Sequence, residues 1–215
     1  MTRPLLIIFL TIFVNLIGFG IIIPLLPFYA EKFGAPPIVI GLLFAIYSLC
    51  QLVAAPVLGD LSDRWGRRPV LVFSLVGTVV SFVMLALAQS IAMLFLARIV
   101  DGLSGGNIST ARAYVADVTE PKDRARAYGL IGAAFGLGFI MGPALSGVLA
   151  KVSITAPIWA AAALTLVASA MAWFWLPETV HRTQAGTGNP LAYLPSLLER
   201  PAIRRVMVID FLYWL

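Results

Sequence analysis

Three charged residues, Arg98, Asp101 and Arg112, lie inside one long apolar stretch of the sequence. Each such charge costs about 2.5–3.5 kcal/mol near the centre of a bilayer, whereas an apolar side chain returns only about 0.3–0.6 kcal/mol. Arg98 and Asp101 are i,i+3 neighbours on a helix, and Arg112 falls near the same face three turns later. The pattern predicts a column of charge that faces a cavity. The alternative is a structural Arg98–Asp101 ion pair, with Arg112 snorkelling toward the cytoplasmic end.

The helices that must position these charges are predicted to cross a membrane. Of the residues, 60% are hydrophobic and 12% are charged, and the mean hydropathy is +0.96. A soluble domain carries about a quarter charged residues, and a span needs about 20 mostly apolar ones. The first run is too long for a signal peptide and is predicted to be retained. Six runs qualify as spans: 5–29, 38–58, 69–88, 91–115, 127–150 and 156–176.

The rest of the chain predicts a linker and a further span. Residues 177–202 are polar and are expected to form a cytoplasmic central linker after the bundle of residues 1–176. Residues 203–215 begin a seventh apolar run that stops at about half a span, so we expect a truncated helix there. With a cytoplasmic N-terminus, eleven of the fifteen Lys and Arg residues fall in inner loops and two in outer loops. This distribution predicts that the N-terminus and the linker are both cytoplasmic.

The loop after the second run is more specific than a positively charged loop needs to be. It reads GDLSDRWGRRPVL from Gly59 to Leu71, and glycines at both ends suggest a tight turn. The ordered spacing resembles the hallmark loop of the major facilitator superfamily. The residues that carry the resemblance are Gly59, Asp63, Arg64, Gly66, Arg67 and Arg68.

Two further stretches resemble signatures of the same superfamily. The run RIVDGLSGG after Arg98 is similar to its fourth-span signature, an arginine followed by small residues. The fifth span resembles the antiporter signature, with Ser146 in place of one glycine and with a proline that removes a backbone hydrogen bond. The matching positions are Gly129, Gly138, Gly142, Pro143 and Gly147. The chain is thus most similar to the tetracycline-exporter-like, drug:proton antiporter branch.

The resemblance implies an all-α membrane protein and a function. The expected fold is a six-transmembrane-helix bundle, a 3+3 inverted repeat, that forms the N-terminal half of a twelve-helix transporter working by alternating access. The loop residues and Asp117 would form a cytoplasmic latch against the missing half or a second copy. The expected protein is a multi-pass protein of the cell membrane that moves small amphiphilic molecules, with protons as coupling ion. We expect no enzymatic activity, cofactor, metal or nucleic-acid partner.

One departure concerns proton coupling. Many proton-coupled members of the family that this chain resembles carry a carboxylate in the first span, but this sequence has Asn15, whose amide does not take up a proton near neutral pH. Asp101 is then the candidate proton carrier of this half, opposed by Arg98, whose charge stabilises the carboxylate. Coupling could equally rest on the other half. The polar mid-span residues Tyr47 and Gln51 join Asn15, Arg98 and Asp101 as the predicted cavity lining, or form a hydrogen bond within the bundle.

The same sequence argues against three other classes of membrane protein. The one histidine, His181, lies in the linker, which argues against an intramembrane protease with a Ser/His or His-Glu-x-x-His site. No re-entrant filter segment is visible, which argues against a channel. A scaffold bundle has no need of the spaced latch residues. A uniporter or symporter of a sugar or metabolite on the same fold remains the serious alternative.

Overall fold

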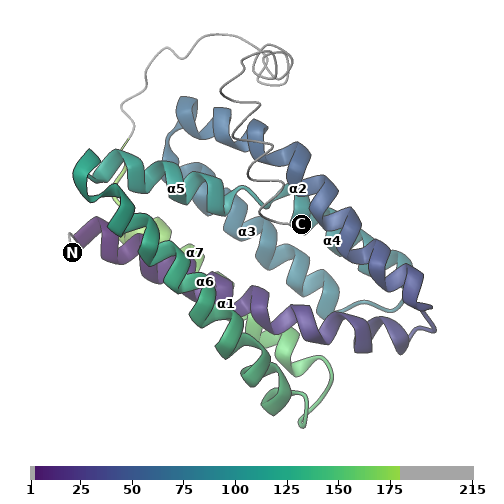
Figure 1. The fold of residues 1–215 in the computed structure, drawn as a ribbon. Coiled ribbons are helices and arrows are strands. Elements are labelled where there is room, and N and C mark those ends of the chain that lie inside the picture. The colour runs from purple at the N-terminus through teal and green to yellow at the C-terminus, as the bar shows by residue number, and fades with distance from the viewer. Residues whose placement is uncertain (1–2, 180–215) are drawn as a thin grey trace, which may run out of the picture. The chain divides into compact units, whose positions relative to one another are not determined.

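Seven α-helices and one 3₁₀ turn follow one another in residues 3–179, the part of the chain that the computed structural model describes (Figure 1). All these residues belong to one folded unit. The predicted start of a seventh span, and the predicted linker beyond Thr179, lie outside the described residues. The elements are α1 (Arg3–Glu31), α2 (Pro37–Trp65), α3 (Arg67–Ala86), α4 (Ile91–Leu103), α5 (Asn107–Val118), η1 (Pro121–Asp123), α6 (Arg124–Leu149) and α7 (Ala156–Trp175).

The described helices make six membrane-length spans, which confirms the predicted all-α membrane protein. The fourth span comprises α4 and α5 together, because the helix breaks over Ser104, Gly105 and Gly106. Two consecutive glycines favour such a break, since glycine costs about 1 kcal/mol relative to alanine in a helix. The second helix runs seven residues beyond the predicted end of its apolar run, to Trp65.

Local sequence signals account for several helix starts. α2 begins with Pro37 directly after Pro36, a position where the missing amide of proline costs nothing. α4 begins after Ser90, whose hydroxyl accepts a hydrogen bond from the Met93 amide (3.3 Å). The two prolines and the Ser90 cap thus set where two helices that carry candidate site residues begin.

The packing of the spans follows two three-span repeats of opposite direction. The first span of the first repeat, α1, packs against α6 and α7 of the second repeat. Correspondingly, the fourth span packs against α2 and α3, and the third spans of the two repeats, α3 and α7, pack against each other. The first span of each repeat thus packs against the second span of the other repeat, which is the arrangement expected of an inverted repeat.

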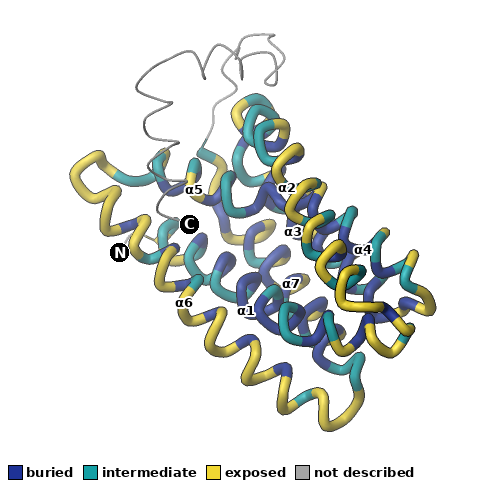
Figure 2. Tube along the Cα trace, turned by 45° about the vertical axis from the view of Figure 1, so that its right-hand side comes forward, coloured by how far each residue is buried: buried dark blue, intermediate teal, exposed yellow. Residues whose placement is uncertain are grey.

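Burial is uneven among the spans (Figure 2). In the most apolar window of α1, 56% of the residues are buried, whereas the figure is 11% for α2 and 28% for α6. The exposed side chains of α2 and α6 include large apolar ones such as Leu52 and Ile140, each more than 70% exposed. The unit thus presents two apolar helices that lipid or further protein must cover.

Candidate functional site

The turn between α2 and α3 holds the basic loop that the sequence singled out. α2 ends at Trp65 and α3 begins at Arg67, so Gly66 alone separates them. Gly66 has a φ of +110°, which side chains rarely tolerate, and its amide donates to the Ser62 carbonyl (3.2 Å). Gly59 instead lies inside α2 without a positive φ. The prediction of a turn glycine at Gly59 is wrong, because the helix continues past its apolar run.

Arg67 is the centre of this junction. Its Nε lies 3.0 Å from Asp117 Oδ2 at the end of α5, and its Nη1 lies 2.5 Å from Asp63 Oδ1 on α2. Nη1 also donates to Ser62 Oγ (2.7 Å). The Arg67 side chain is 13% exposed, against 52% for Asp63. A guanidinium with three partners is held more firmly than a single surface ion pair, so Arg67 joins α2, α3 and α5.

The two other arginines of the loop make local contacts. Arg64 pairs with Asp60 one turn earlier on α2, with 2.9 Å between Nε and Oδ2. Arg68 lies over the ring of Trp173 on α7, 5.2 Å from its centroid, and donates to the Trp173 carbonyl. The Arg64–Asp60 pair therefore stabilises the end of α2 itself, whereas Arg68 fastens α3 to α7 through a cation–π contact.

Glu178, which the sequence gave no reason to single out, completes the junction. Its carboxylate accepts hydrogen bonds from the backbone amides of Arg67 (2.9 Å) and Arg68 (3.2 Å) at the start of α3. A Cβ at Gly66 would lie 2.5 Å from Glu178 Oε2, so the glycine also makes room for the carboxylate. Anions at a helix N-terminus are stabilised by the free amides and the helix dipole. Glu178 thus ties the end of α7 to α3.

The Arg98–Asp101 pair is enclosed within the unit. Arg98 Nη2 lies 2.9 Å from Asp101 Oδ2, and the two residues are 2% and 3% exposed. Thr78 on α3 interacts with the carboxylate, and the guanidinium lies 5.4 Å from the ring centroid of Tyr47 on α2. Arg112 is exposed on a separate helix. The predicted single column of charge is wrong, because the break after α4 interrupts the helix phase.

The other predicted cavity residues lie close to this pair or inside α1. Gln51 Nε2 donates to the Tyr47 hydroxyl and to the Gly105 carbonyl, both at 3.2 Å. The hydrogen bond between Gln51 and Tyr47 thus spans one turn of α2, which is the alternative that their i,i+4 spacing allowed. Asn15 is 4% exposed, and its Oδ1 has no hydrogen-bond partner among residues 3–179. A buried amide oxygen of this kind is costly, so a water or a moving partner would stabilise it.

The fifth-span glycines fall into two groups. Gly138 and Gly142 meet α1 so closely that a Cβ at Gly142 would lie 2.4 Å from the Gly20 carbonyl carbon. Gly129 and Gly147 have no heavy atom within 4 Å of an added Cβ. Pro143 lies inside α6, which continues to Leu149. Only two of the motif's glycines therefore serve packing within this unit.

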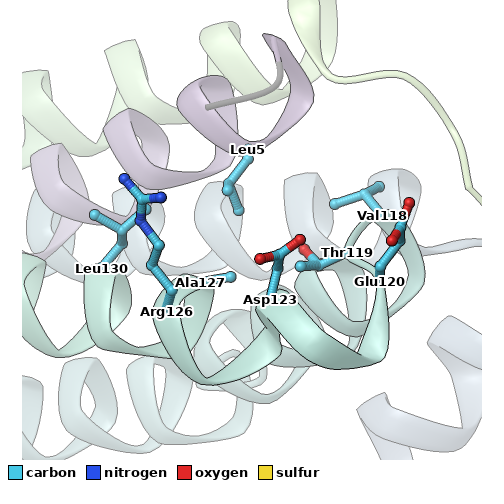
Figure 3. A pocket seen from close by; sticks show the side chains of 8 residues that line it. All are labelled: Leu5, Val118, Thr119, Glu120, Asp123, Arg126, Ala127 and Leu130. Carbon is cyan, nitrogen blue, oxygen red and sulfur yellow. The ribbon is translucent and has the colours of Figure 1, made fainter.

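A hollow of about 330 Å³ lies at the same end of the bundle as the Arg67 junction (Figure 3). Leu5 of α1 faces Ala127 and Leu130 of α6 across it, and residues that follow α5 close one side. Its charges are mixed, because Glu120, Asp123 and Arg126 line it together. None of the predicted cavity or latch residues lines this hollow.

Comparison with known proteins places these features in a family. A family model for the Major Facilitator Superfamily matches residues 8–215. The tetracycline resistance protein, class G, of Vibrio anguillarum is 41% identical over 186 residues, which are 85% of this chain and 47% of that protein. The quinolone resistance protein NorA of Staphylococcus aureus is 30% identical over 187 residues, 86% of this chain and 48% of that protein. The chain spans about half the length of the curated relatives it matches.

The fold has a counterpart among solved structures. The crystal structure of the human organic anion transporter MFSD10 (TETRAN) matches with a TM-score of 0.76 and 29% sequence identity. The match covers 89% of this chain and 52% of that one.

Proposed function

We propose that this chain, which belongs to the Major Facilitator Superfamily, supplies one half of a proton-coupled exporter of small amphiphilic molecules. In this proposal the unit works by alternating access together with a second six-helix half, or a second copy of the chain, in a cell membrane. The N-terminus, the α2–α3 turn and the end of α7 face the cytoplasm, in line with the excess of Lys and Arg in those loops.

The names of the relatives support export. Tetracycline and quinolone resistance proteins among them are similar to this chain over most of its length. The fifth-span signature points the same way, since it resembles that of antiporters.

The observation that carries the proposal is the Arg67 junction. One guanidinium joins the ends of α2, α3 and α5, while the Asp63 carboxylate beside it stays half exposed. A fixed charge network with one accessible carboxylate is suited to making and breaking contacts with a second half as the transporter changes state. A purely structural turn would need neither Asp63 nor its exposure.

The alternative is a uniporter or symporter of a sugar or metabolite, and Asn15 favours it. α1 has no acid before Glu31 at its end, and Asp101, the one buried acid among residues 3–179, is already paired with Arg98. Proton uptake by Asp101 would have to weaken that pair, or occur in the other half.

The test is proton release from energised everted vesicles that contain the complete transporter, with a pH-sensitive dye and a panel of amphiphilic drugs. Asp63→Asn is compared with Glu120→Gln, which removes an acid at the same end that pairs with Lys122 and is 71% exposed. We expect at least one drug to release protons in the wild type and the Glu120→Gln variant, and none to do so in Asp63→Asn.

Equal activity of Asp63→Asn and the wild type would overturn the latch role. If no drug moves protons while the protein is folded, the antiporter proposal fails and the uniporter or symporter takes its place.

A further inference from the structure

Arg112 is the charge of the fourth span that the described unit leaves uncompensated. Arg98 pairs with Asp101 and Arg67 with Asp117, but Arg112 has no ion-pair partner among residues 3–179. It lies on α5 six residues before the helix ends, and its side chain is exposed. Ionisable residues inside membrane spans usually face a cavity or a functional partner, since lipid does not solvate them.

A hollow opens directly beside this arginine. Its volume is about 340 Å³, and it is lined by Arg112 of α5 and by Tyr128, Ile131, Gly132 and Phe135 of α6. Gly132 has no heavy atom within 4 Å of an added Cβ, so the wall of α6 is open at that point. The Tyr128 hydroxyl donates to the backbone carbonyl of Arg112 at 3.5 Å, which leaves the guanidinium available to a ligand. The hollow therefore combines one cation with two aromatic rings.

Aromatic contacts continue from this hollow across three helices. Phe135 stacks on Phe139 with 6.3 Å between ring centroids, and Phe139 meets Phe19 of α1 edge to face at 6.2 Å. Phe19 contacts Tyr47 of α2 at 5.8 Å, and Tyr47 lies against Arg98. The rings are half-buried, except Phe139, which is 44% exposed. The Phe135 and Phe139 rings are nearly parallel, with 15° between their planes, so they offer apolar faces on which the rings of a ligand can stack.

We infer that the Arg112 hollow is a subsite for the carboxylate or sulfonate of an aromatic organic anion. Arg112 forms the charge-assisted bond to the acid group, and the rings of the anion lie along Phe135 and Phe139. A cationic amphiphile would meet an uncompensated guanidinium here, because the acids of the neighbouring spans already have arginine partners. This inference rests on the proposed transport function and names its substrate class.

The experiment uses two dyes with the same ring system and opposite charge. Fluorescein carries a free carboxylate, whereas rhodamine 123 has amino groups in place of the outer xanthene oxygens and a methyl ester in place of the carboxylate, and is cationic. Initial rates of transport into vesicles that contain the complete protein are measured for Arg112→Gln, Arg112→Lys and the charge-matched control Lys151→Gln, a loop residue. We expect Arg112→Gln to raise the KM for fluorescein at least about tenfold, as loss of a charged hydrogen bond does. Arg112→Lys restores part of this loss.

A second pair of variants tests the hollow itself. Gly132→Leu fills it and is expected to weaken fluorescein transport, whereas Ala133→Leu, on the adjacent exposed position of α6, leaves it unchanged. Because no atom lies near a Cβ at Gly132, the substitution is compatible with the fold of the described unit.

Failure of this inference differs from failure of the proposed function. Transport of rhodamine 123 but not of fluorescein, or an equal loss of both dyes in Arg112→Gln, overturns the anion subsite while export stands. Arg112-dependent fluorescein transport without proton movement supports the subsite and removes proton coupling.

Discussion

The crossing of α1 and α6 predicts opposite effects for two glycines of the same motif. An alanine Cβ at Gly142 would lie 2.4 Å from the carbonyl carbon of Gly20, 2.6 Å from its Cα and 2.8 Å from the Ile21 nitrogen. All three atoms belong to the backbone, so no side-chain rotation relieves the contact. Gly129, thirteen residues before Gly142 in the sequence, has nothing within 4 Å of an added Cβ.

The magnitudes follow from these distances. To bring the Gly142→Ala contact from 2.4 Å to the 3.4 Å of ordinary packing, α1 and α6 must separate locally by about 1 Å. Overpacking of this kind costs about 1–3 kcal/mol. Gly129→Ala meets no atom and improves helix propensity, so it stabilises by about 0.5–1 kcal/mol. The two variants should therefore differ by about 1.5–4 kcal/mol.

The assay is thermal unfolding of the purified complete protein in detergent, with both alanine variants measured beside the wild type. For a protein of the relatives' length, about twice that of this chain, the midpoint shifts by about 1–2 °C per kcal/mol. We therefore expect the midpoints of the two variants to differ by about 2 °C or more, with Gly142→Ala the lower. A Gly142→Ala protein as stable as the wild type would contradict the close crossing. If Gly129→Ala were equally destabilised, the motif glycines would act through something other than contact with α1.

Two further substitutions test the charged groups, with the same thermal midpoint as readout. Asp101→Asn leaves the buried Arg98 without its partner and should destabilise the protein by about 3–5 kcal/mol. A double variant that also replaces Arg98 with methionine should recover most of this loss. Absence of any recovery would show that the pair does not act as a unit. Glu178→Gln weakens the cap of α3 and should cost about 1 kcal/mol, whereas Glu120→Gln, exposed at the same end, should cost nothing, so equal midpoints for both would argue against the cap.

The number of spans follows from the sequence because a bilayer demands about 20 apolar residues per helix, whatever the neighbours are. Boundaries depend on other terms. α2 extends through the polar residues from Gly59 to Trp65 because backbone hydrogen bonds continue outside the apolar run. Hydropathy does not reveal the helix break at Ser104–Gly106, because the mean hydropathy of a span-length window is high whether or not the helix is continuous.

In the site, too, contacts between residues close in the sequence can be predicted, whereas contacts between distant segments cannot. The contact of Arg98 with Asp101 follows from i,i+3 spacing. Its burial does not, because α2 and α3 supply the Tyr47 and Thr78 side chains that enclose the pair. Glu178 lies 111 residues from Arg67 in the sequence, so no local pattern links the carboxylate to the amides it caps.

The two repeats use their close crossings differently, and this difference bears on how the unit can move. At the crossing of α2 and α4, a Cβ at Gly102 would lie 2.5 Å from the Tyr47 carbonyl oxygen, and Tyr47 also contacts the buried Arg98. Separating these helices would expose an ion pair, and breaking such a pair costs about 3–5 kcal/mol.

At the crossing of α1 and α6, the backbones of Gly20 and Gly142 meet and Phe19 contacts Phe139, so a small shift changes only apolar packing. Apolar contacts are individually weak and reform after a shift, whereas a buried charge has no substitute partner. We therefore expect α1 and α6 to shift against each other during transport, while α2 and the fourth span move as one body. Gly138 and Gly142 then lie where this helix pair shifts, and the hollow beside Arg112 borders the moving helix α6.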